Sequence, residues 1–495
     1  MKKFKYLLFS IFLAVLCVAC SNDEYKMLIP KNAKAVVAVN LKQLFDGYEL
    51  PESAKSKIYN LLKLFVSGSD SDLLIDLIEG NEDSGIDFNE PFYIFKAPDS
   101  FWGASLKVDD IDDLDELFSL MYRQNLCNKP VEKDDYKWTA ILDDISAVYN
   151  EDVLSLMFSN SISDTKKKQN ALLNNDEEDT FFATEKFSKM DDMEGPLKFL
   201  FSADAFVNYN DKDFKNVIDN LHALLPEGVR PVDVCVVGDL STGKGIVNVD
   251  YELFSTNKKT QMLLEKEDNK YKKIKGDFIG APNDFACWLA LGVKGEDFVR
   301  KLKQFNTIDQ YIIKLERAID IENILQSISG DVALLLPNNF ENDELSAFVL
   351  SANLNNTDFL KSVDLWMNQM VDFNATMDEV AKNSYVLKAD SMQLNWGVDN
   401  KNIYFATGNS FFKSAFAEKS DKLNEVEEDI RNSVFFVYIN VEGINEKLEE
   451  KFDLYKKLNF LEYITLKASD YRNYHLTFVL KEKEKNIWQI LSDQI

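Results

Sequence analysis

Cys20 is the residue whose type and position most directly predict a chemical modification. The 19 residues before it combine lysines at the start, the apolar run Leu7–Val18 and the small residue Ala19. The apolar run holds 12 residues, whereas a helix needs about 20 to span a bilayer, so the pattern is typical of a cleaved secretory leader. A cysteine that becomes the first residue after cleavage is the lipid acceptor of bacterial lipoproteins. We therefore predict a signal peptide over residues 1–19 and lipidation of Cys20.

Two alternatives remain for this segment. Cys17 would have Leu16 directly before it, whereas the peptidase requires a small residue there, and Ala19 meets that requirement for Cys20. The second alternative is an ordinary secretory leader, after which Cys20 has no role. The polar residues 21–24 that follow Cys20 favour cleavage at this cysteine over cleavage at Cys17.

A glycine-rich stretch, Gly238–Lys244, matches the first part of a phosphate-binding loop. The next residue is Gly245, where such a loop carries the Ser or Thr that holds magnesium. The alternating run Ile246–Leu253 also predicts a strand where the loop requires the start of a helix. We interpret this stretch as a hairpin turn and not as a nucleotide site.

Histidines and clustered acids offer little further chemistry. His222 and His475 lack a His or Cys neighbour at zinc-binding spacing, and both are interpreted as surface residues. The acidic clusters Asp70–Asp72, Glu82–Asp83 and Asp109–Asp113 do not follow the EF-hand spacing. The last cluster precedes a helical pattern, so its carboxylates are expected to cap free N–H groups. No catalytic, cofactor-binding or metal-ligating residue is predicted, and no cofactor.

Three thiols remain after the leader: Cys127, Cys235 and Cys287. An odd number at wide spacing does not describe a disulfide framework. Cys235 and Cys287 lie in apolar runs, and we interpret them as buried small hydrophobic residues. The redox state of the three thiols stays open.

Tryptophan side chains stack well on sugar rings, so each of the six tryptophans is a candidate sugar-binding residue. Trp288, Trp366 and Trp396 lie in apolar patterns that predict a place in the core. Trp102 and Trp138 are the two whose surroundings assign them least clearly to the core.

The composition is that of a folded and strongly acidic protein. Hydrophobic residues make up 46% of the chain, and the formal net charge is −27. A charge of this sign repels phosphate backbones and anionic lipid head groups, so nucleic acid is excluded as a partner.

The order of predicted elements occurs twice along the chain. Each copy has a strand after a proline (Pro30, Pro282), then a hairpin and a helix, a second hairpin, a strand with a helix, and a terminal hairpin. We predict an α+β fold of two tandem duplicated units, residues 28–265 and 278–495. Each is expected to be a mostly antiparallel sheet with helices packed on one face.

The segments around these units are predicted from charge and length. Residues 20–27 are expected to form a short tether, and the lysine-rich residues 266–277 the linker between the units. The charged residues 160–178 predict an exposed loop with weak order.

The start of the predicted mature chain carries a family resemblance. Its pattern is Ile29-Pro30-x-x-Ala33-x-x-Val36-Val37-x-Val39-Asn40-Leu41-Lys42-x-Leu44, a few residues after Cys20. It resembles a family of Bacteroidota-type exported lipoproteins known as a domain of unknown function. That resemblance implies no catalytic residues. In such bacteria, acidic residues just after the lipidated cysteine act as a surface-export signal, and Ser21-Asn22-Asp23-Glu24 resembles a short version, which favours the outer membrane.

These observations favour a lipid-anchored, non-catalytic lipoprotein of the outer membrane, on its periplasmic or surface face. Such a module would bind or scaffold an envelope protein or glycan partner. One alternative is a carboxylate-based envelope hydrolase acting on glycans, which predicts two carboxyl groups about 5–10 Å apart beside an exposed aromatic residue. Another alternative is a carrier of a hydrophobic ligand, which predicts a large apolar cavity.

Overall fold

The computed structural model describes most of the chain after residue 23. The described residues are 24–44, 84–97, 101–133, 135–141, 145–158, 162–202, 205, 223–283, 285–305, 309–310, 312–313, 316, 319–337, 348–370, 375–389, 392–407, 416, 420–442, 444 and 458–494. Cys20, the predicted signal peptide, His222 and the acidic clusters at 70–72 and 82–83 lie outside them.

The internal contacts of the chain divide it into two compact units. The first comprises Met1–Phe201 with Ser492–Ile495, and the second comprises Ser202–Leu491. This grouping follows contacts and not the repeated order of elements. The predicted repeat boundaries, 28–265 and 278–495, therefore stay a prediction.

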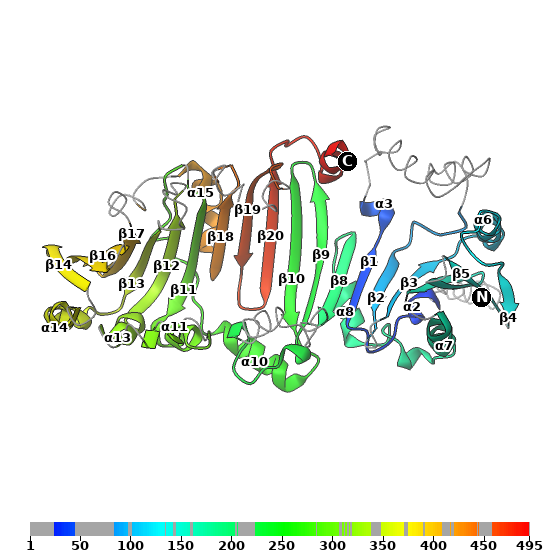
Figure 1. The fold of residues 1–495 in the computed structure, drawn as a ribbon, viewed down its shortest axis with the longest axis horizontal. Coiled ribbons are helices and arrows are strands. Elements are labelled where there is room, and N and C mark those ends of the chain that lie inside the picture. Colours follow the sequence, from blue (N-terminus) through cyan, green and yellow to red (C-terminus); the bar gives the residue numbers. More distant parts are fainter. Residues whose placement is uncertain are drawn as a thin grey trace, which may run out of the picture. The chain divides into compact units, whose positions relative to one another are not determined.

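The first unit contains eight described strands in the order β8–β1–β2–β3–β7–β6–β5–β4 (Figure 1). Every neighbouring pair is antiparallel. The strands are β1 (Ala35–Val39), β2 (Phe92–Lys96), β3 (Trp102–Lys107), β4 (Val131–Lys133), β5 (Tyr136–Ile141), β6 (Ile145–Tyr149), β7 (Val153–Phe158) and β8 (Leu197–Ser202).

Helices cover both faces of this sheet. The helices of the unit are α2 (Glu24–Met27), α3 (Leu41–Leu44), α6 (Ile111–Arg123), α7 (Ile162–Leu173) and α8 (Glu185–Asp191). Neighbouring residues on a strand point to opposite faces. On β3, Leu106 packs into the core formed with Leu114 and Phe118 of α6, whereas the Ser105 hydroxyl donates to the Tyr25 carbonyl of α2.

Helix α6 begins as its sequence predicts. The side chain of Asp110 accepts hydrogen bonds from the backbone N–H groups of Asp112 and Asp113. These groups have no partner within the helix, so the carboxylate satisfies them and complements the helix dipole. The predicted capping role of the third acidic cluster is confirmed.

The second unit contains twelve described strands in the order β9–β10–β20–β19–β18–β11–β12–β13–β17–β16–β15–β14, again all antiparallel. The α+β class with an antiparallel sheet is thus as predicted. The strands are β9 (Cys235–Gly243), β10 (Ile246–Phe254), β11 (Cys287–Lys294), β12 (Ile328–Leu336), β13 (Val349–Leu354), β14 (Ala375–Ala381), β15 (Ser384–Ala389), β16 (Met392–Asp399), β17 (Asn402–Thr407), β18 (Phe435–Asn440), β19 (Leu461–Ala468) and β20 (Asn473–Leu480).

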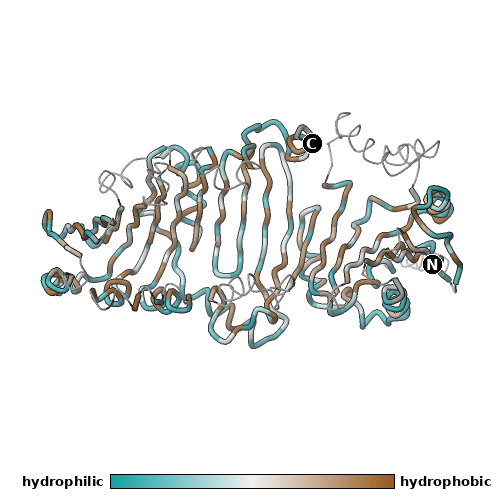
Figure 2. Tube along the Cα trace, in the orientation of Figure 1, coloured by the Kyte–Doolittle hydropathy of each residue, from teal (hydrophilic) through white to brown (hydrophobic). Residues whose placement is uncertain are grey.

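Helices also lie on both faces of this second sheet, which corrects the prediction of one covered face. On β12, Val332 packs with Trp366 of α14 (Val363–Gln369), and its neighbour Ala333 packs with Leu423 of α15 (Asp421–Glu425) and Ile430 of α16 (Glu427–Arg431). The physical reason is composition: β12 ends in a continuous apolar run, which needs cover on both sides. Figure 2 shows hydrophobic residues distributed along these strands.

Four other α-helices are described in the second half of the chain. They are α10 (Lys258–Asp268), α11 (Gly295–Leu302), α13 (Ile321–Gln326) and the C-terminal α19 (Ile487–Gln494). Among the described residues, no helix is both long and apolar enough to cross a membrane.

The phosphate-loop-like stretch lies in a hairpin, as predicted. Strands β9 and β10 pair along their whole length, and the chain turns at Lys244 and Gly245. Gly245 has a φ of +72°, a left-handed conformation that glycine adopts without a steric penalty. A strand follows where a nucleotide site would need a helix, so this interpretation is confirmed.

A lysine and several tyrosines cluster in the second unit, where Tyr471 is buried and Lys301 and Tyr271 are half-buried. Lys301 donates from Nζ to the carbonyl oxygens of Leu224 (2.6 Å) and Leu225 (3.0 Å). The Tyr471 hydroxyl donates to the same Leu224 oxygen at 2.7 Å, and the rings of Tyr471 and Tyr271 stack. Burial lowers the pKa of Lys301 to about 8 and raises the pKa of Tyr271 to about 12.

We expect the free energy of unfolding to rise from pH 8 to pH 10 and to fall above pH 10. Between pH 8 and pH 10, Lys301 of the folded protein is above its pKa of about 8 and is mostly neutral. Lys301 of the unfolded chain stays protonated up to about pH 10.4, so the unfolded state binds more protons. In the upper window, unfolded tyrosines ionise at about pH 10 while folded Tyr271 stays protonated. Urea unfolding across this range measures both slopes. Lys301→Met should abolish the rise and keep the fall, and a rise that persists in this variant would contradict the assignment.

Candidate functional site

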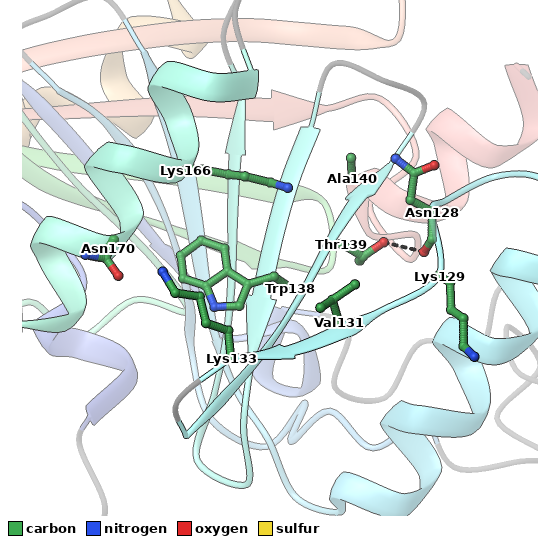
Figure 3. Close-up of a pocket in the computed structure, with 9 residues that line it drawn as sticks. All are labelled: Asn128, Lys129, Val131, Lys133, Trp138, Thr139, Ala140, Lys166 and Asn170. Atoms are coloured by element: carbon green, nitrogen blue, oxygen red, sulfur yellow. Dashed lines mark hydrogen bonds between the residues drawn. The ribbon is translucent and has the colours of Figure 1, made fainter.

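A pocket of about 420 Å³ opens in the first unit, lined from helix α7 and from the β4–β5 hairpin (Figure 3). This volume lies within the range of small-molecule sites, about 300–1,000 Å³. Three lysines, two asparagines, one tryptophan and three smaller side chains line it: Lys129, Lys133, Lys166, Asn128, Asn170, Trp138, Val131, Thr139 and Ala140.

Strand alternation places Trp138 in the pocket. Trp138 and Ala140 lie two residues apart on β5, so both point to the same face of the sheet. Ala140 pairs with Ser146 of β6, and Ser146 is the residue that contacts α7. Trp138 is half-buried, and its indole lies between the side chains of Lys133 and Lys166 in the view of Figure 3.

Helix α7 is held over the sheet by the buried amide of Gln169, which is 1% exposed. Its Oε1 accepts from the Ser146 hydroxyl at 2.5 Å, and its Nε2 donates to the carbonyl oxygens of Ser146 (3.1 Å) and Ser155 (3.2 Å). Thr165, one turn earlier, is also buried. Lys166 and Asn170 each follow one of these residues, so they lie along the flank of the helix that borders the pocket.

The predicted exposed loop over residues 160–178 is therefore wrong for Ile162–Leu173. The buried side of α7 carries Thr165 and Gln169 in place of leucines, so hydrophobic periodicity does not reveal it. The helix is stable because strands β6 and β7 supply hydrogen-bond partners for a buried amide.

The β4–β5 hairpin forms the opposite wall. Val131 lies directly across from Trp138, and Lys133 is two residues further along β4 on the same face. The Thr139 hydroxyl donates to the Asn128 carbonyl at 2.5 Å, and the Asn128 N–H donates to the Ala140 carbonyl at 2.9 Å. These bonds fix the chain that enters β4.

The residues that line the pocket carry a positive charge, whereas the chain as a whole is acidic. Its lining includes no aspartate or glutamate, although the whole chain carries a net charge of −27. Lys129, Lys133 and Lys166 form no ion pair with any described residue. Ammonium groups without a protein counter-ion beside an aromatic ring favour an anionic ligand.

The other tryptophans divide as the sequence predicts. Trp288, Trp366 and Trp396 are buried, which confirms their place in the core. Trp102 on β3 is 39% exposed and has the Lys96 ammonium 5.6 Å from its ring centroid.

His475 takes part in a hydrogen-bonded row across β10 and β20. Its Nδ1 lies 2.6 Å from Asp250 Oδ1, and its Nε2 lies 2.9 Å from the Thr477 hydroxyl. The order carboxylate, imidazole, hydroxyl resembles an acyl-transfer triad. However, Thr477 is only 9% exposed and its hydroxyl donates to Asn248, so the row joins two strands and presents no free nucleophile.

The cysteines and acidic groups form no reactive centre in the described part of the chain. Cys127, Cys235 and Cys287 form no disulfide with one another, and Cys235 is buried as predicted, while Cys287 is half-buried. Burial raises the pKa of Cys127, and that of Cys287 to about 11, which suppresses the nucleophilic thiolate. No group of three potential metal ligands occurs among the described residues.

A family model spans almost the whole of the described chain, from residue 25 to residue 487. The chain belongs to the family described as domain of unknown function DUF4836. A search of curated proteins finds no match. Among solved structures, crystal form I of TP0453 matches with 11% identity and a TM-score of 0.26, covering 51% of this chain and 88% of that chain. Crystal form IV of TP0453 matches with 8% identity and a TM-score of 0.25, covering 46% and 79%.

Of the residues that line this DUF4836 pocket, sequence reasoning had singled out Trp138 alone. The lysines at 129, 133 and 166 and the asparagines at 128 and 170 were missed because each lies in a polar stretch that resembles a solvated surface. The sequence offers only a weak signal, the uncharged pair Thr165 and Gln169 four residues apart within a charged run, and their burial is seen only in the structure.

Replacing Gln169 with leucine should lower the free energy of unfolding by about 2–3 kcal/mol, because buried groups of Ser146 and Ser155 would lose their partner. Urea unfolding measures the loss, and amide hydrogen exchange should show faster opening of α7. Lys167→Leu on the same helix is the control, since this exposed residue makes no such bond and should change stability by about 0.5 kcal/mol or less. Equal effects of the two substitutions would contradict this role of Gln169.

Proposed function

We propose that this protein is a lipid-anchored lipoprotein of the outer membrane whose first unit binds an anionic ligand and does not transform it. The observation that carries the proposal is the pocket itself, which combines a half-exposed indole with three exposed lysines that form no ion pair with a described residue. An aromatic surface with a few convergent polar groups is the usual composition of a ligand site.

The two alternative functions receive less support from this site. A carboxylate-based hydrolase needs a pair of carboxyl groups beside the bound sugar, and the lining residues offer ammonium and amide groups. A carrier of a hydrophobic ligand needs a large enclosed apolar cavity, whereas this pocket is open to solvent and five of its nine lining residues are lysine or asparagine. We therefore propose binding without catalysis as the function of this pocket.

The position of α2 sets how far the first unit could lie from a lipid attached to Cys20. Tyr25 is 1% exposed, and its carbonyl accepts a hydrogen bond from the Ser105 hydroxyl. The chain is thus held to the first unit five residues after Cys20, and five residues reach at most about 18 Å. A lipid on Cys20 would keep this unit close to the membrane surface.

A tandem duplication is also part of the proposal. Strand β1 pairs with β2 and β8, and β11 pairs with β12 and β18. The strands β3, β7, β6, β5 and β4 pair in that order, as do β13, β17, β16, β15 and β14. Each copy then ends in a hairpin, β9–β10 and β19–β20, and the two hairpins pair through β10 and β20. Unrelated sequences rarely produce the same strand order twice, so duplication of one unit accounts for it.

Replacing Cys20 with serine should move the protein from the envelope fraction to the soluble fraction, because the hydroxyl cannot serve as the acceptor of the lipid. Cell fractionation with immunoblotting measures the distribution. Cys17→Ser is the matched control and should leave the protein in the envelope. Retention of the Cys20→Ser protein in the envelope would contradict the anchor and leave the pocket proposal untouched.

Citrate, an anion without a ring, should change the fluorescence of Trp138, measured as the difference between the protein and its Trp138→Phe variant. Lys166→Gln should weaken citrate binding about two- to fivefold, since an exposed charge pair contributes ~0.5–1 kcal/mol. Lys167→Gln removes the same charge from the next residue of α7, which does not line the pocket, and should leave the affinity unchanged. Equal weakening by both substitutions would indicate a general charge effect and contradict a specific anion site.

A further inference from the structure

We infer that the ligand of the Trp138 pocket is an acidic sugar, a pyranose ring that carries a carboxylate. This inference rests on the proposed anion site and assigns its ligand class. Three features of the pocket support it separately: an accessible aromatic face, two lysines beside that face, and side-chain amides that form no hydrogen bond with a described residue.

The aromatic face is suited to a sugar ring. Val131 lies directly across from Trp138 on β4, and Ala140 lies two residues along β5, so these two side chains that line the pocket beside the indole are smaller than the indole. The indole is therefore open toward the pocket (Figure 3). One face of a pyranose presents mainly C–H groups, and such a face packs on the apolar surface of an indole.

Two lysines can reach the same ligand from different elements. Lys133 extends from β4 and Lys166 from α7, and their side chains flank the indole in Figure 3. Neither forms an ion pair with a described residue. A carboxylate on the edge of a ring that is stacked on Trp138 would lie where either ammonium group can contact it.

The amides supply the remaining recognition. Asn170 lies one turn after Lys166 on the same flank of α7, and Asn128 precedes β4 on the opposite wall. Neither side-chain amide has a hydrogen-bond partner among the described residues. An amide offers both a donor and an acceptor, which matches two adjacent hydroxyl groups of a sugar.

The overall charge and the size of the pocket restrict the ligand further. A net charge of −27 repels long polyanions, whereas a short ligand with one or two charges interacts mainly with the lysines. A volume of about 420 Å³ corresponds to a small ligand, and we assign one or two sugar rings.

Isothermal titration of the full mature chain with three probes tests this inference. The probes are the disaccharide of galacturonic acid, its methyl ester, and glutarate, which is a dicarboxylate without a ring. We expect the acidic disaccharide to bind at least about tenfold more tightly than either of the others. Asn170→Ala should weaken disaccharide binding and leave glutarate binding unchanged.

Lys166→Gln should reduce the preference for the acid over its ester, and the control Lys167→Gln should preserve that preference. Equal affinities for the acid and the ester would overturn the inference, because the charge would then have no role. Equal affinities for glutarate and the disaccharide would also overturn it, while the proposed anion site would stand. If neither citrate nor any of these probes binds, the proposed function fails together with the inference.

Discussion

Three hydrogen bonds to the buried amide of Gln169 hold helix α7 on the sheet of the first unit, and the pocket depends on them. A buried amide without partners would cost several kcal/mol, so the helix and the strands that satisfy it specify each other. Because Gln169 fixes the rotation of α7, Lys166 and Asn170 border the indole of Trp138. The buried amide of Gln169 therefore fixes the orientation of α7, whereas an apolar helix face would tolerate more variation in helix rotation.

The packing of both sheets imposes a second constraint, which limits the positions at which functional side chains can occur. Both β3 in the first unit and β12 in the second carry neighbouring residues that pack on opposite faces, so each sheet is covered on both sides. Such strands leave little freedom for functional side chains within the sheet. The pocket accordingly uses a strand end, an edge hairpin and a helix that joins two strands, where packing does not dictate the side chains.

Local patterns predicted much of the fold. The alternation in Ile246–Leu253 predicted a strand and a hairpin, and Asp110 at the start of α6 caps the helix as its position before an apolar run indicates. The helices on the second face of the second unit's sheet were missed because they contain few apolar residues, such as Leu423 and Ile430, and lie in acidic segments. The α7 segment was missed because Thr165 and Gln169 form its buried side.

The sequence by itself determined the acidic surface, the α+β class, the hairpins and the core positions of Trp288, Trp366 and Trp396, because each depends on composition or on spacing between near neighbours. It also supplied the prediction of an anchor at Cys20. Only the tertiary structure decided that Trp138 lines a pocket with lysines from β4 and α7. The reason is physical: which side of a polar helix is buried depends on hydrogen-bond partners on other strands, and no periodicity within the helix encodes those partners.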